Sequence, residues 1–257
     1  MPRYDFRRPR LYVAAGLHAG AAVTLEAPQL HYLRDVLRLG PSDGVLIFNG
    51  ADGEWEASLA GAGKRGADKR GAVLAVEAQV RPQPPPGDLH YLFSPLKRAR
   101  LDYMIQKAVE MGVSRLQPVI MRHTQAERIN LDRMRANAIE AAEQCGILAI
   151  PQVGAPADFA TALAALEPLR HVVFCDEDAP CADPVAALRA DVPAAPERAT
   201  ALAVLIGPEG GFAEDERARL VQRPHTSRIA LGPRILRADT AAVAALAIVQ
   251  AAAGDWR

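Results

Sequence analysis

Short apolar runs separated by turn-forming residues fill most of the first eighty positions, a pattern typical of β-strands. The pairs Asn49-Gly50 and Asp52-Gly53 stand between two of these runs and predict a hairpin there. The expected strands are residues 11–14, 22–26, 44–50, 54–60 and 72–80. This spacing of short strands predicts a small barrel or sandwich.

Residues 28–40, "PQLHYLRDVLRLG", break the pattern with a helical period. Gly40 stands where such a helix would end. The expected apolar face holds Leu30, Leu33, Val36 and Leu37, and the expected polar face holds His31, Arg34 and Arg38.

A proline-rich segment, "RPQPPPGD", then separates this region from a second one, because consecutive prolines enter neither a helix nor a central strand. We expect a first domain at residues 1–81, a linker at 82–88 and a second domain at 89–257. In the second domain strands at 89–94, 116–121, 171–176, 201–207 and 228–232 alternate with helical segments. The strands are apolar along their length, which predicts an α/β domain with a largely parallel sheet covered on both faces.

Two helical stripes are clear in this second domain. One runs through Leu101, Met104, Ile105 and Ala108 and ends at Gly112. The other runs through Leu131, Met134, Ala138 and Ala141, and its spacing predicts that Cys145 is a core residue, not a nucleophile.

Composition adds little to this picture. Half of the 257 residues are hydrophobic and 23% are charged, as in ordinary globular proteins. No apolar run is long enough to cross a bilayer and the N-terminus lacks a signal peptide, so we expect a cytoplasmic protein without membrane association. Three cysteines without a CxxC pair or a histidine cluster predict no metal site and no disulfide framework.

Charge is balanced overall but uneven along the chain. Residues 97–135 carry nine Lys/Arg and four Asp/Glu, a net of +5, whereas residues 140–216 carry three Arg and fourteen acids, a net of −11. Residues 217–257 return to +5, from seven Arg and two Asp. This distribution suits a basic face for a polyanion, unless the segments interleave in space and cancel.

Glycine-proline pairs follow two of the expected strands, in "IGPEGGF" (206–212) and "LGPRILRAD" (231–239). Ligands of parallel sheets bind at the carboxyl ends of the strands. Neither a Walker loop nor a dinucleotide fingerprint is present, and the carboxylates of Glu209, Glu214, Asp215 and Glu216 oppose a bound anion. The expected ligand is therefore neutral or cationic and is held by backbone hydrogen bonds, a description that S-adenosylmethionine fits.

The same segments carry a family resemblance. "VLIGPEGGF" (204–212) and "LGPRILRADTAA" (231–242), together with "KRARLDYMIQKAVEMGVSRLQPV", "EAAEQCG" and "HYLRDVLRLGPSDGVLIFNG", resemble motifs of the RsmE family of ribosomal RNA methyltransferases, in the same order. The resemblance implies a trefoil-knotted SPOUT methyltransferase domain behind a PUA-like β-barrel. It also implies a homodimer, formed through the methyltransferase domain, that methylates N3 of a uridine in 16S rRNA of the small ribosomal subunit. Pattern alone predicts no knot.

Three positions depart from the family pattern. Ala213 replaces a Ser or Thr N-cap, which is expected to weaken the start of the following helix by about 1 kcal/mol. Asp239 stands where Glu is usual, and Ile147 stands where Arg is usual.

These considerations assign three groups of site residues. The expected cofactor pocket holds Asp176, Ile206, Gly207, Glu209, Gly210, Gly211, Leu231, Gly232, Ile235, Leu236 and Arg237. Candidates for catalysis are Arg234 and Arg237, as stabilisers of enolate charge or phosphate ligands, and Asp239 or Glu209, as the proton acceptor. For Asp239 a role as the cap of the last helix stays open. Candidate RNA contacts are Arg3, Arg7, Arg8, Arg10, His31, Arg34, Arg38, Arg122 and Arg128.

Two other functions remain open at this point. One is a related methyltransferase that acts on another RNA position, such as a ribose 2′-hydroxyl. The other is a non-catalytic RNA-binding or ribosome-assembly protein, although the intact glycine motifs favour a working cofactor site.

Overall fold

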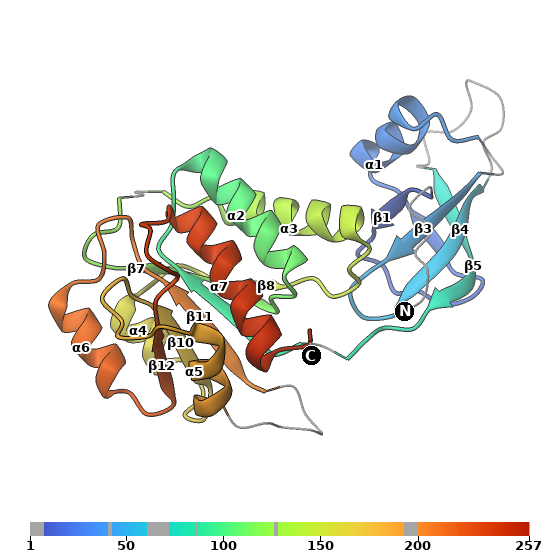
Figure 1. Cartoon of the computed structure of the whole chain (residues 1–257). Helices are drawn as coiled ribbons and strands as arrows, with labels where there is room; N and C mark the ends of the chain where they lie inside the picture. Colours follow the sequence, from blue (N-terminus) through green and yellow to red (C-terminus); the bar gives the residue numbers. More distant parts are fainter. Residues whose placement is uncertain are drawn as a thin grey trace. The chain divides into compact units, whose positions relative to one another are not determined.

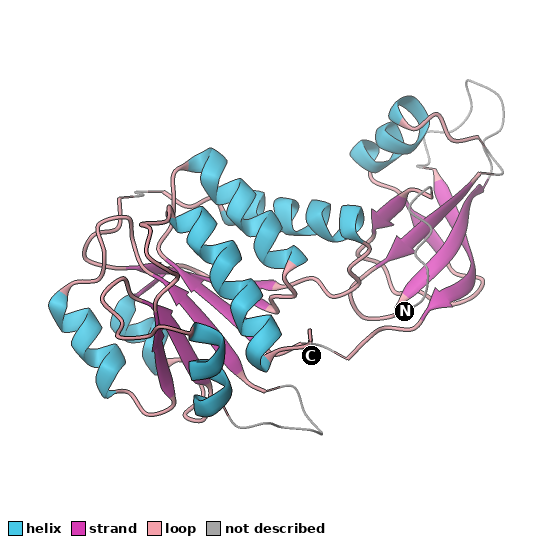
Figure 2. Ribbon diagram, in the orientation of Figure 1, coloured by secondary structure: helices cyan, strands magenta, loops and turns pink. Residues whose placement is uncertain are grey.

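The computed structural model describes residues 8–40, 43–60, 72–85, 87–125, 128–192 and 200–256. It divides into two compact units, whose helices and strands are shown in Figures 1 and 2. Unit 1 comprises Met1–Pro85 and Ala142–Ile150, and unit 2 comprises Pro86–Ala141 and Pro151–Arg257. The sequence pattern did not indicate that Ala142–Ile150 joins the first unit, and the domain limits given above stay a prediction.

Unit 1 is built on a five-stranded sheet in the order β1-β3-β4-β5-β2. Strands β3, β4, β5 and β2 pair antiparallel, and β1 pairs parallel with β3. The strands are β1 (Arg10–Tyr12), β2 (Ala22–Thr24), β3 (Gly44–Phe48), β4 (Glu54–Ala60) and β5 (Val73–Arg81). All five expected strands are therefore present, and they curl around an apolar core that includes Val45, Ile47, Leu59, Leu74 and Val76.

The turn between β3 and β4 forms as its sequence indicates. The Asn49 side chain accepts hydrogen bonds from the backbone N–H groups of Ala51 and Asp52, at 3.0 and 2.8 Å. The Asp52 carboxylate in turn accepts the Leu17 N–H at 2.9 Å. This backbone hydrogen bond and the Asn49 amide hold the pKa of Asp52 below its usual value.

The expected helix at residues 28–40 is shorter and changes type. It consists of α1 (Ala27–His31) and a π-helical segment η1 (Tyr32–Val36). Leu33 is fully buried as expected, but Val36 is 57% exposed, so its assignment to the apolar face was wrong. A π-turn contains more residues than an α-turn, which rotates later side chains away from the α-helical stripe. The π-helical segment ends at Val36, before Gly40, and Arg38 beyond it takes a left-handed conformation with φ +57°.

Unit 2 is built on a parallel sheet in the order β12-β10-β11-β6-β7-β8, with β9 paired to β7. Its strands are β6 (Leu89–Phe93), β7 (Arg115–Ile120), β8 (Gln152–Val153), β9 (Ala157–Asp158), β10 (His171–Cys175), β11 (Leu202–Ile206) and β12 (Thr226–Ile229). The parallel sheet expected from the apolar strands is confirmed. The two-residue strands β8 and β9 were not predicted because they are too short to show a period.

Helices cover both faces of this sheet (Figure 1). They are α2 (Arg98–Glu110), α3 (Leu131–Cys145), α4 (Phe159–Ala164), α5 (Pro184–Asp191), α6 (Glu214–Gln222) and α7 (Ala238–Ala253). On one side α2 and α5 pack against α7. On the other, Phe159 of α4 and Leu220 of α6 pack with Leu92, Phe174 and Leu205 of the sheet. Within the described ranges no helix is both long and apolar enough to cross a membrane.

The apolar stripe of α3 ends earlier than expected. Met134, Ala138 and Ala141 are buried, but Cys145 is exposed, so its prediction as a core residue was wrong. The division between the two units falls at Ala142. The last turn of the helix has thus left the unit against which the stripe packs, and spacing alone could not indicate this.

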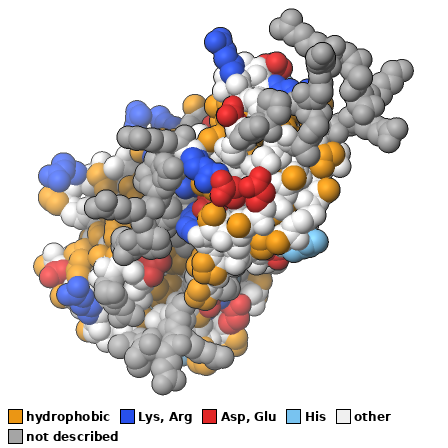
Figure 3. Space-filling model, turned by 90° about the vertical axis from the view of Figure 1, so that its right-hand side faces the viewer, with side chains coloured by type: hydrophobic (Ala, Val, Ile, Leu, Met, Phe, Trp, Pro, Cys, Tyr) orange, Lys and Arg blue, Asp and Glu red, His pale blue; other side chains and the backbone are white. Residues whose placement is uncertain are grey.

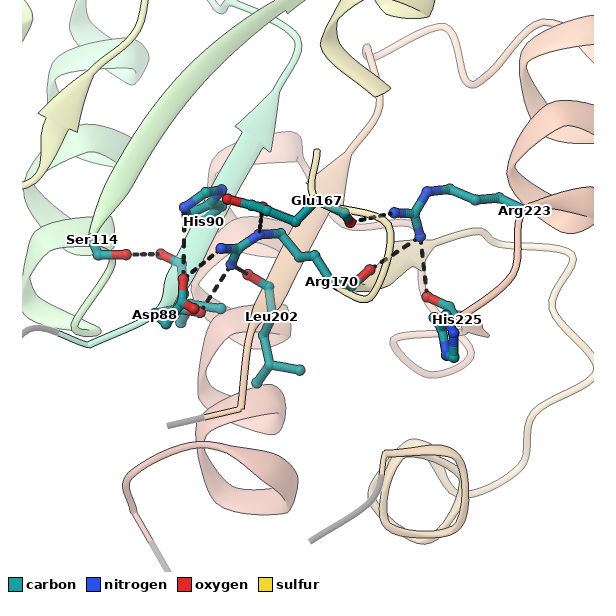
Figure 4. Close-up of polar contacts among 9 residues, drawn as sticks. Asp88, His90, Ser114, Glu167, Arg170, Leu202, Arg223 and His225 are labelled. Carbon is teal, nitrogen blue, oxygen red and sulfur yellow. Dashed lines mark hydrogen bonds and ion pairs between the residues drawn. The ribbon is translucent and has the colours of Figure 1, made fainter. Parts of the chain in front are cut away.

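Arg170 holds together the amino ends of three strands of unit 2 (Figure 4). Its buried guanidinium donates to the carbonyl oxygens of Asp88 and Leu202, at 3.2 and 2.9 Å, and to the carboxylates of Asp88 and Glu167, both at 2.6 Å. Asp88 precedes β6, and Leu202 begins β11. Arg223 extends this cluster by donating to the backbone carbonyl of Arg170 at 3.1 Å. Hydrogen bonds from these arginines therefore connect the amino ends of the strands. This edge of the sheet is opposite the one where ligands of parallel sheets bind.

His90 gives this cluster a pH dependence. Burial, and next the positive charge of Arg170, lower the pKa of His90 from 6.5 to about 4. Between these two values the unfolded chain binds a proton that the folded chain rejects, so stability present above pH 6.5 is lost as the pH falls. At 1.36 kcal/mol per pKa unit the loss is at most ~3 kcal/mol, and solvent screening of this partly accessible ring reduces it to about 1–2 kcal/mol.

We expect the free energy of unfolding to fall by about 1–2 kcal/mol more in the wild type than in His90→Gln between pH 6.5 and 4. Chemical denaturation at a series of pH values measures both slopes. His18→Gln, which changes an exposed histidine of unit 1, is the control and should keep the wild-type slope. Equal slopes in wild type and His90→Gln would contradict the assignment.

Candidate cofactor and RNA site

The loops that follow β10, β11 and β12 lie at one edge of the sheet of unit 2. Strand β10 lies between β11 and β12, and all three run parallel. Their carboxyl ends therefore present Asp176, the turn 207–212 and the loop 230–237 together. Parallel sheets bind ligands at this edge, and the expected cofactor residues are brought to it.

The turn after β11 is packed tightly against the loop after β7. Gly211 has φ +75°, and its N–H donates to the Pro208 carbonyl at 2.9 Å. A Cβ atom at Gly210 would lie 3.2 Å from the Cβ of His123. His123 also binds this turn, with Nδ1 3.0 Å from the Gly211 carbonyl oxygen. The turn is thus fixed by its neighbour, and its peptide groups have one defined orientation.

The loop after β12 offers backbone and apolar groups to a ligand. Gly232 has φ +97°, and a Cβ atom placed there would meet nothing within 4 Å. The Ile235 side chain is 91% exposed. Among the described residues, the peptide N–H groups of Leu231, Gly232, Arg234, Ile235 and Leu236 find no hydrogen-bond acceptor. Unpartnered N–H groups beside apolar side chains fit a nucleoside without phosphate, and hence S-adenosylmethionine.

Every carboxylate of the acidic stretch except that of Glu214 contacts a partner within the described chain. Glu209 pairs with Arg100 at 2.5 Å, and Asp215 approaches Arg122 at 3.5 Å. The buried Glu216 accepts the N–H groups of Ala213 and Arg122, both at 2.9 Å. Ala213 provides no side-chain cap, as expected, but Glu216 satisfies its N–H, which is half of a capping box.

Asp176 is buried between two arginines. Its carboxylate lies 3.1 Å from Nη2 of Arg217 and 2.8 Å from Nε of Arg228. These guanidinium groups compensate the cost of burying its charge. Its role in the cofactor pocket stays a prediction.

The residues proposed for catalysis differ in their surroundings. Arg234 and Arg237 are exposed, so both can meet a large ligand. Asp239 lies in the first turn of α7, where Oδ1 accepts the Thr240 N–H at 3.0 Å. A carboxylate in this position stabilises the start of a helix, and the N-cap itself is Arg237.

The candidate RNA contacts of unit 1 fall into two groups. Arg34 and Arg38 are exposed, and His31 is exposed but paired with Asp35 at 2.6 Å. Arg8 is half-buried and pairs with Glu56 at 2.5 Å. Arg3 and Arg7 lie outside the described residues. On the face drawn in Figure 3, described basic side chains lie beside acidic and apolar ones, and no broad field of one charge is visible there.

Arg10 corrects one prediction. Its side chain is only 4% exposed, and Nε donates to Oε1 of the buried Glu54 at 2.9 Å. Arg81 binds the same carboxylate through two further hydrogen bonds of 2.7 and 2.9 Å. A phosphate cannot reach a guanidinium in this position, so Arg10 is a structural residue. In unit 2, Arg122 and Arg128 are exposed.

A cavity of about 340 Å³ opens beside the turn after β11. The sequence did not predict this cavity, although the polar segment "RHTQ" (122–125) begins one residue after the carboxyl end of the parallel strand β7. Its wall is formed by Ser94, Pro95, Leu96, Lys97, Arg98, Ala99, Arg100, His123, Gln125, Pro208 and Glu209. In the described part of the chain, no group of three or more His, Cys, Asp or Glu residues is placed to hold a metal ion.

Comparisons with known proteins agree with this architecture. The family described as "RNA methyltransferase domain" matches residues 83–250, and that described as "RNA methyltransferase PUA domain" matches residues 25–70. The ribosomal RNA small subunit methyltransferase E of Synechocystis sp. is 30% identical, over 94% of this chain and 77% of that protein. The protein of the same name from Rickettsia conorii is 28% identical over 94% of both chains.

Two solved structures are similar over nearly the whole chain. A methyltransferase from Legionella pneumophila, solved with the bound cofactor SAM, has a TM-score of 0.80 and 25% identity, with 97% of this chain and 99% of that chain covered. A ribosomal RNA small subunit methyltransferase E from Neisseria gonorrhoeae, bound to S-adenosyl methionine, has a TM-score of 0.76 and 25% identity, with 97% and 100% covered. With the parallel sheet, the two glycine-proline loops and the curled N-terminal sheet, these matches establish that the chain belongs to the ribosomal RNA small subunit methyltransferase E family.

Proposed function

We propose that this protein transfers a methyl group from S-adenosylmethionine to N3 of one uridine in 16S rRNA of the small ribosomal subunit. The observation that carries the proposal is the pair of loops at residues 207–212 and 230–237. Among the described residues, the N–H groups of Leu231, Gly232, Arg234, Ile235 and Leu236 find no acceptor, and these groups and the exposed Ile235 side chain lie at the edge of the sheet where ligands of parallel sheets bind. When bound, S-adenosylmethionine supplies an electrophilic methyl group on a positively charged sulfur.

The loops suit this cofactor better than a nucleotide. Glu209 precedes the glycines of one loop, and Glu214 and Asp215 follow them, so a phosphate group there would meet negative charge. The adenine, the ribose and the sulfonium of S-adenosylmethionine carry no negative charge. The carboxylate of this cofactor belongs to its methionine part. We assign Ile206, Gly207, Glu209, Gly210 and Gly211 to one side of the cofactor pocket. The other side consists of Asp176, Leu231, Gly232, Ile235, Leu236 and Arg237.

Methylation at N3 requires that the uracil lose its N3 proton, which places negative charge on O2 and O4. Arg234 and Arg237 are exposed in the cofactor loop and are proposed to stabilise this charge or to hold a nearby phosphate. Glu209 and Asp239 are the carboxylates at this edge that could accept the proton. The proposed contacts to the RNA backbone are Arg8, His31, Arg34, Arg38 and Arg122.

Further properties belong to the same proposal. We place the protein in the cytoplasm, where 16S rRNA is assembled into subunits, and infer a homodimer formed through the methyltransferase domain. The segment around β11, β12 and α7 is proposed to form the trefoil knot.

Calorimetry separates this function from the non-catalytic alternative. The wild-type protein is expected to bind S-adenosylmethionine with measurable heat, because the intact loops supply the contacts. An RNA-binding or assembly protein with a decayed pocket would show no binding at millimolar cofactor, and this result would overturn the proposal. Methylation of a ribose 2′-hydroxyl instead would appear as a modified sugar in nucleoside analysis of the product.

A further inference from the structure

The family comparison assigns no function to the cavity beside the cofactor turn. The cavity also lies outside the cofactor loops after β10 and β12. At about 340 Å³ it lies at the small end of the range of ~300–1,000 Å³ found for small-molecule sites, a size that suits one nucleotide. Ser94, Pro95 and Leu96 are buried in its wall, whereas Lys97 and Arg98 are exposed beside it. The buried wall suits a base that is flipped out of the RNA, and the exposed cations suit its phosphate, which would stay outside the cavity.

The cavity shares a wall with the proposed cofactor site. Pro208 and Glu209 line it, and they belong to the same turn as Gly210 and Gly211. A base in the cavity and a cofactor held by the turn would therefore be neighbours, as direct methyl transfer requires.

His123 lines this cavity with a defined tautomer. Its Nδ1 lies 3.0 Å from the Gly211 carbonyl oxygen, which can only accept a hydrogen bond, so Nδ1 carries the proton. In the neutral ring Nε2 then has a lone pair and can accept a proton. The same hydrogen bond ties the ring to the cofactor turn and fixes its orientation.

The two carboxylates at this edge are less suited to that task. Glu209 forms an ion pair of 2.5 Å with Arg100, which already balances its charge. Asp239 accepts the Thr240 N–H in the first turn of α7 and is not among the residues that line the cavity. Among the described residues of the cavity wall, His123 is therefore the side chain best suited to accept a proton.

We propose that the cavity receives the target uridine and that Nε2 of His123 is the catalytic base that takes its N3 proton. This inference rests on the proposed function and adds to it the substrate pocket and the base. In the step, the N3–H bond breaks and its proton moves to Nε2, while the N3 electron pair forms the bond to the methyl carbon. The carbon–sulfur bond breaks with its electrons on sulfur, which leaves S-adenosylhomocysteine, 3-methyluridine and an imidazolium at His123.

The test compares methyl transfer to unmethylated small subunits by wild type, His123→Ala and His18→Ala. His18 is a matched control because it is an exposed histidine whose Nδ1 also lies near a backbone carbonyl, that of Ala19 at 3.1 Å. His123→Ala is expected to lose about 10²- to 10⁴-fold in rate, the usual contribution of a general base. Added imidazole should restore part of this rate. The rates are compared at saturating S-adenosylmethionine, because His123→Ala also removes the hydrogen bond to the cofactor turn. His18→Ala should retain the wild-type rate.

Two results would overturn the assignment of the base. One is a His123→Ala rate within about threefold of wild type, which is far below the contribution of a general base. The other is a loss that imidazole does not rescue, which indicates a structural role.

A second experiment tests the cavity without any methyl transfer. It titrates the full-length protein with 5′-UMP and monitors binding through the imidazole NMR signals of His123. A shift in the wild type that Arg100→Ala weakens supports the cavity, and no shift at millimolar 5′-UMP overturns it. If 5′-UMP shifts His123 but the wild type methylates no small subunits, the proposed function fails while the nucleotide cavity stands.

Discussion

Replacing Gly232 by valine is expected to weaken S-adenosylmethionine binding by more than 100-fold, which corresponds to about 2.7 kcal/mol. Gly232 has φ +97°, and a Cβ atom there would meet nothing within 4 Å. The N–H groups of Leu231, Gly232 and Arg234 in this loop find no acceptor among the described residues. A β-branched side chain at this position would cover these groups and disfavour the backbone conformation that presents them. Isothermal titration calorimetry with the purified variant measures the loss.

Gly20→Val is the matched control for this variant. Gly20 lies in unit 1 with φ +80°, and a Cβ atom there also meets nothing within 4 Å. The backbone strain is therefore comparable, while the cofactor loops are unchanged. The control should bind the cofactor as the wild type does. Equal affinities of Gly232→Val and the wild type for S-adenosylmethionine would show that the loop after β12 is not part of the cofactor site.

Removing the carboxylate of Glu54 is expected to lower the unfolding free energy of unit 1 by about 3–5 kcal/mol. Glu54 is 2% exposed and binds both Arg10 and Arg81. In Glu54→Ala the cluster loses its shared carboxylate, so positive charge is left in the interior. Chemical denaturation followed by the fluorescence of Trp55, which lies in unit 1, reports the change.

Glu56→Ala provides the comparison on the same strand. Glu56 pairs with Arg8, but its side chain is 37% exposed, and pairs of this kind contribute only about 0–1 kcal/mol. A loss below 1 kcal/mol in Glu54→Ala as well would mean that the buried cluster contributes no more than the exposed pair.

Periodicity was a good guide to the elements of this fold because it reports which side chains are buried. The stripe of α2 is buried as predicted, and the apolar strands of unit 2 form the parallel sheet. The prediction of buried residues failed at two kinds of place: where the backbone departs from α-helical geometry, and where the chain passes from one unit to the other. The π-turn exposes Val36, and Cys145 is exposed in the last turn of α3, which belongs to unit 1 and not to the unit of the rest of the helix.

The candidate site was predictable only in part for a similar reason. Glycine-proline turns after apolar strands are local signals, and they led to the cofactor loops. Pairing between distant residues leaves no local signal, as in the buried pair of Arg10 and Glu54 and the exposed pair of Arg100 and Glu209. His123 was missed for the same reason, since its contact with Gly211 spans 88 positions.

Reverse transcription of 16S rRNA tests the central claim most directly. Methylation at N3 blocks the Watson–Crick edge of uracil, so extension stops at the modified uridine. We expect one such stop in the parent strain, its loss in a strain that lacks this gene, and its return with the wild-type gene but not with Gly232→Val. A stop that persists in the deletion strain would contradict the assignment of this protein as the uridine N3 methyltransferase.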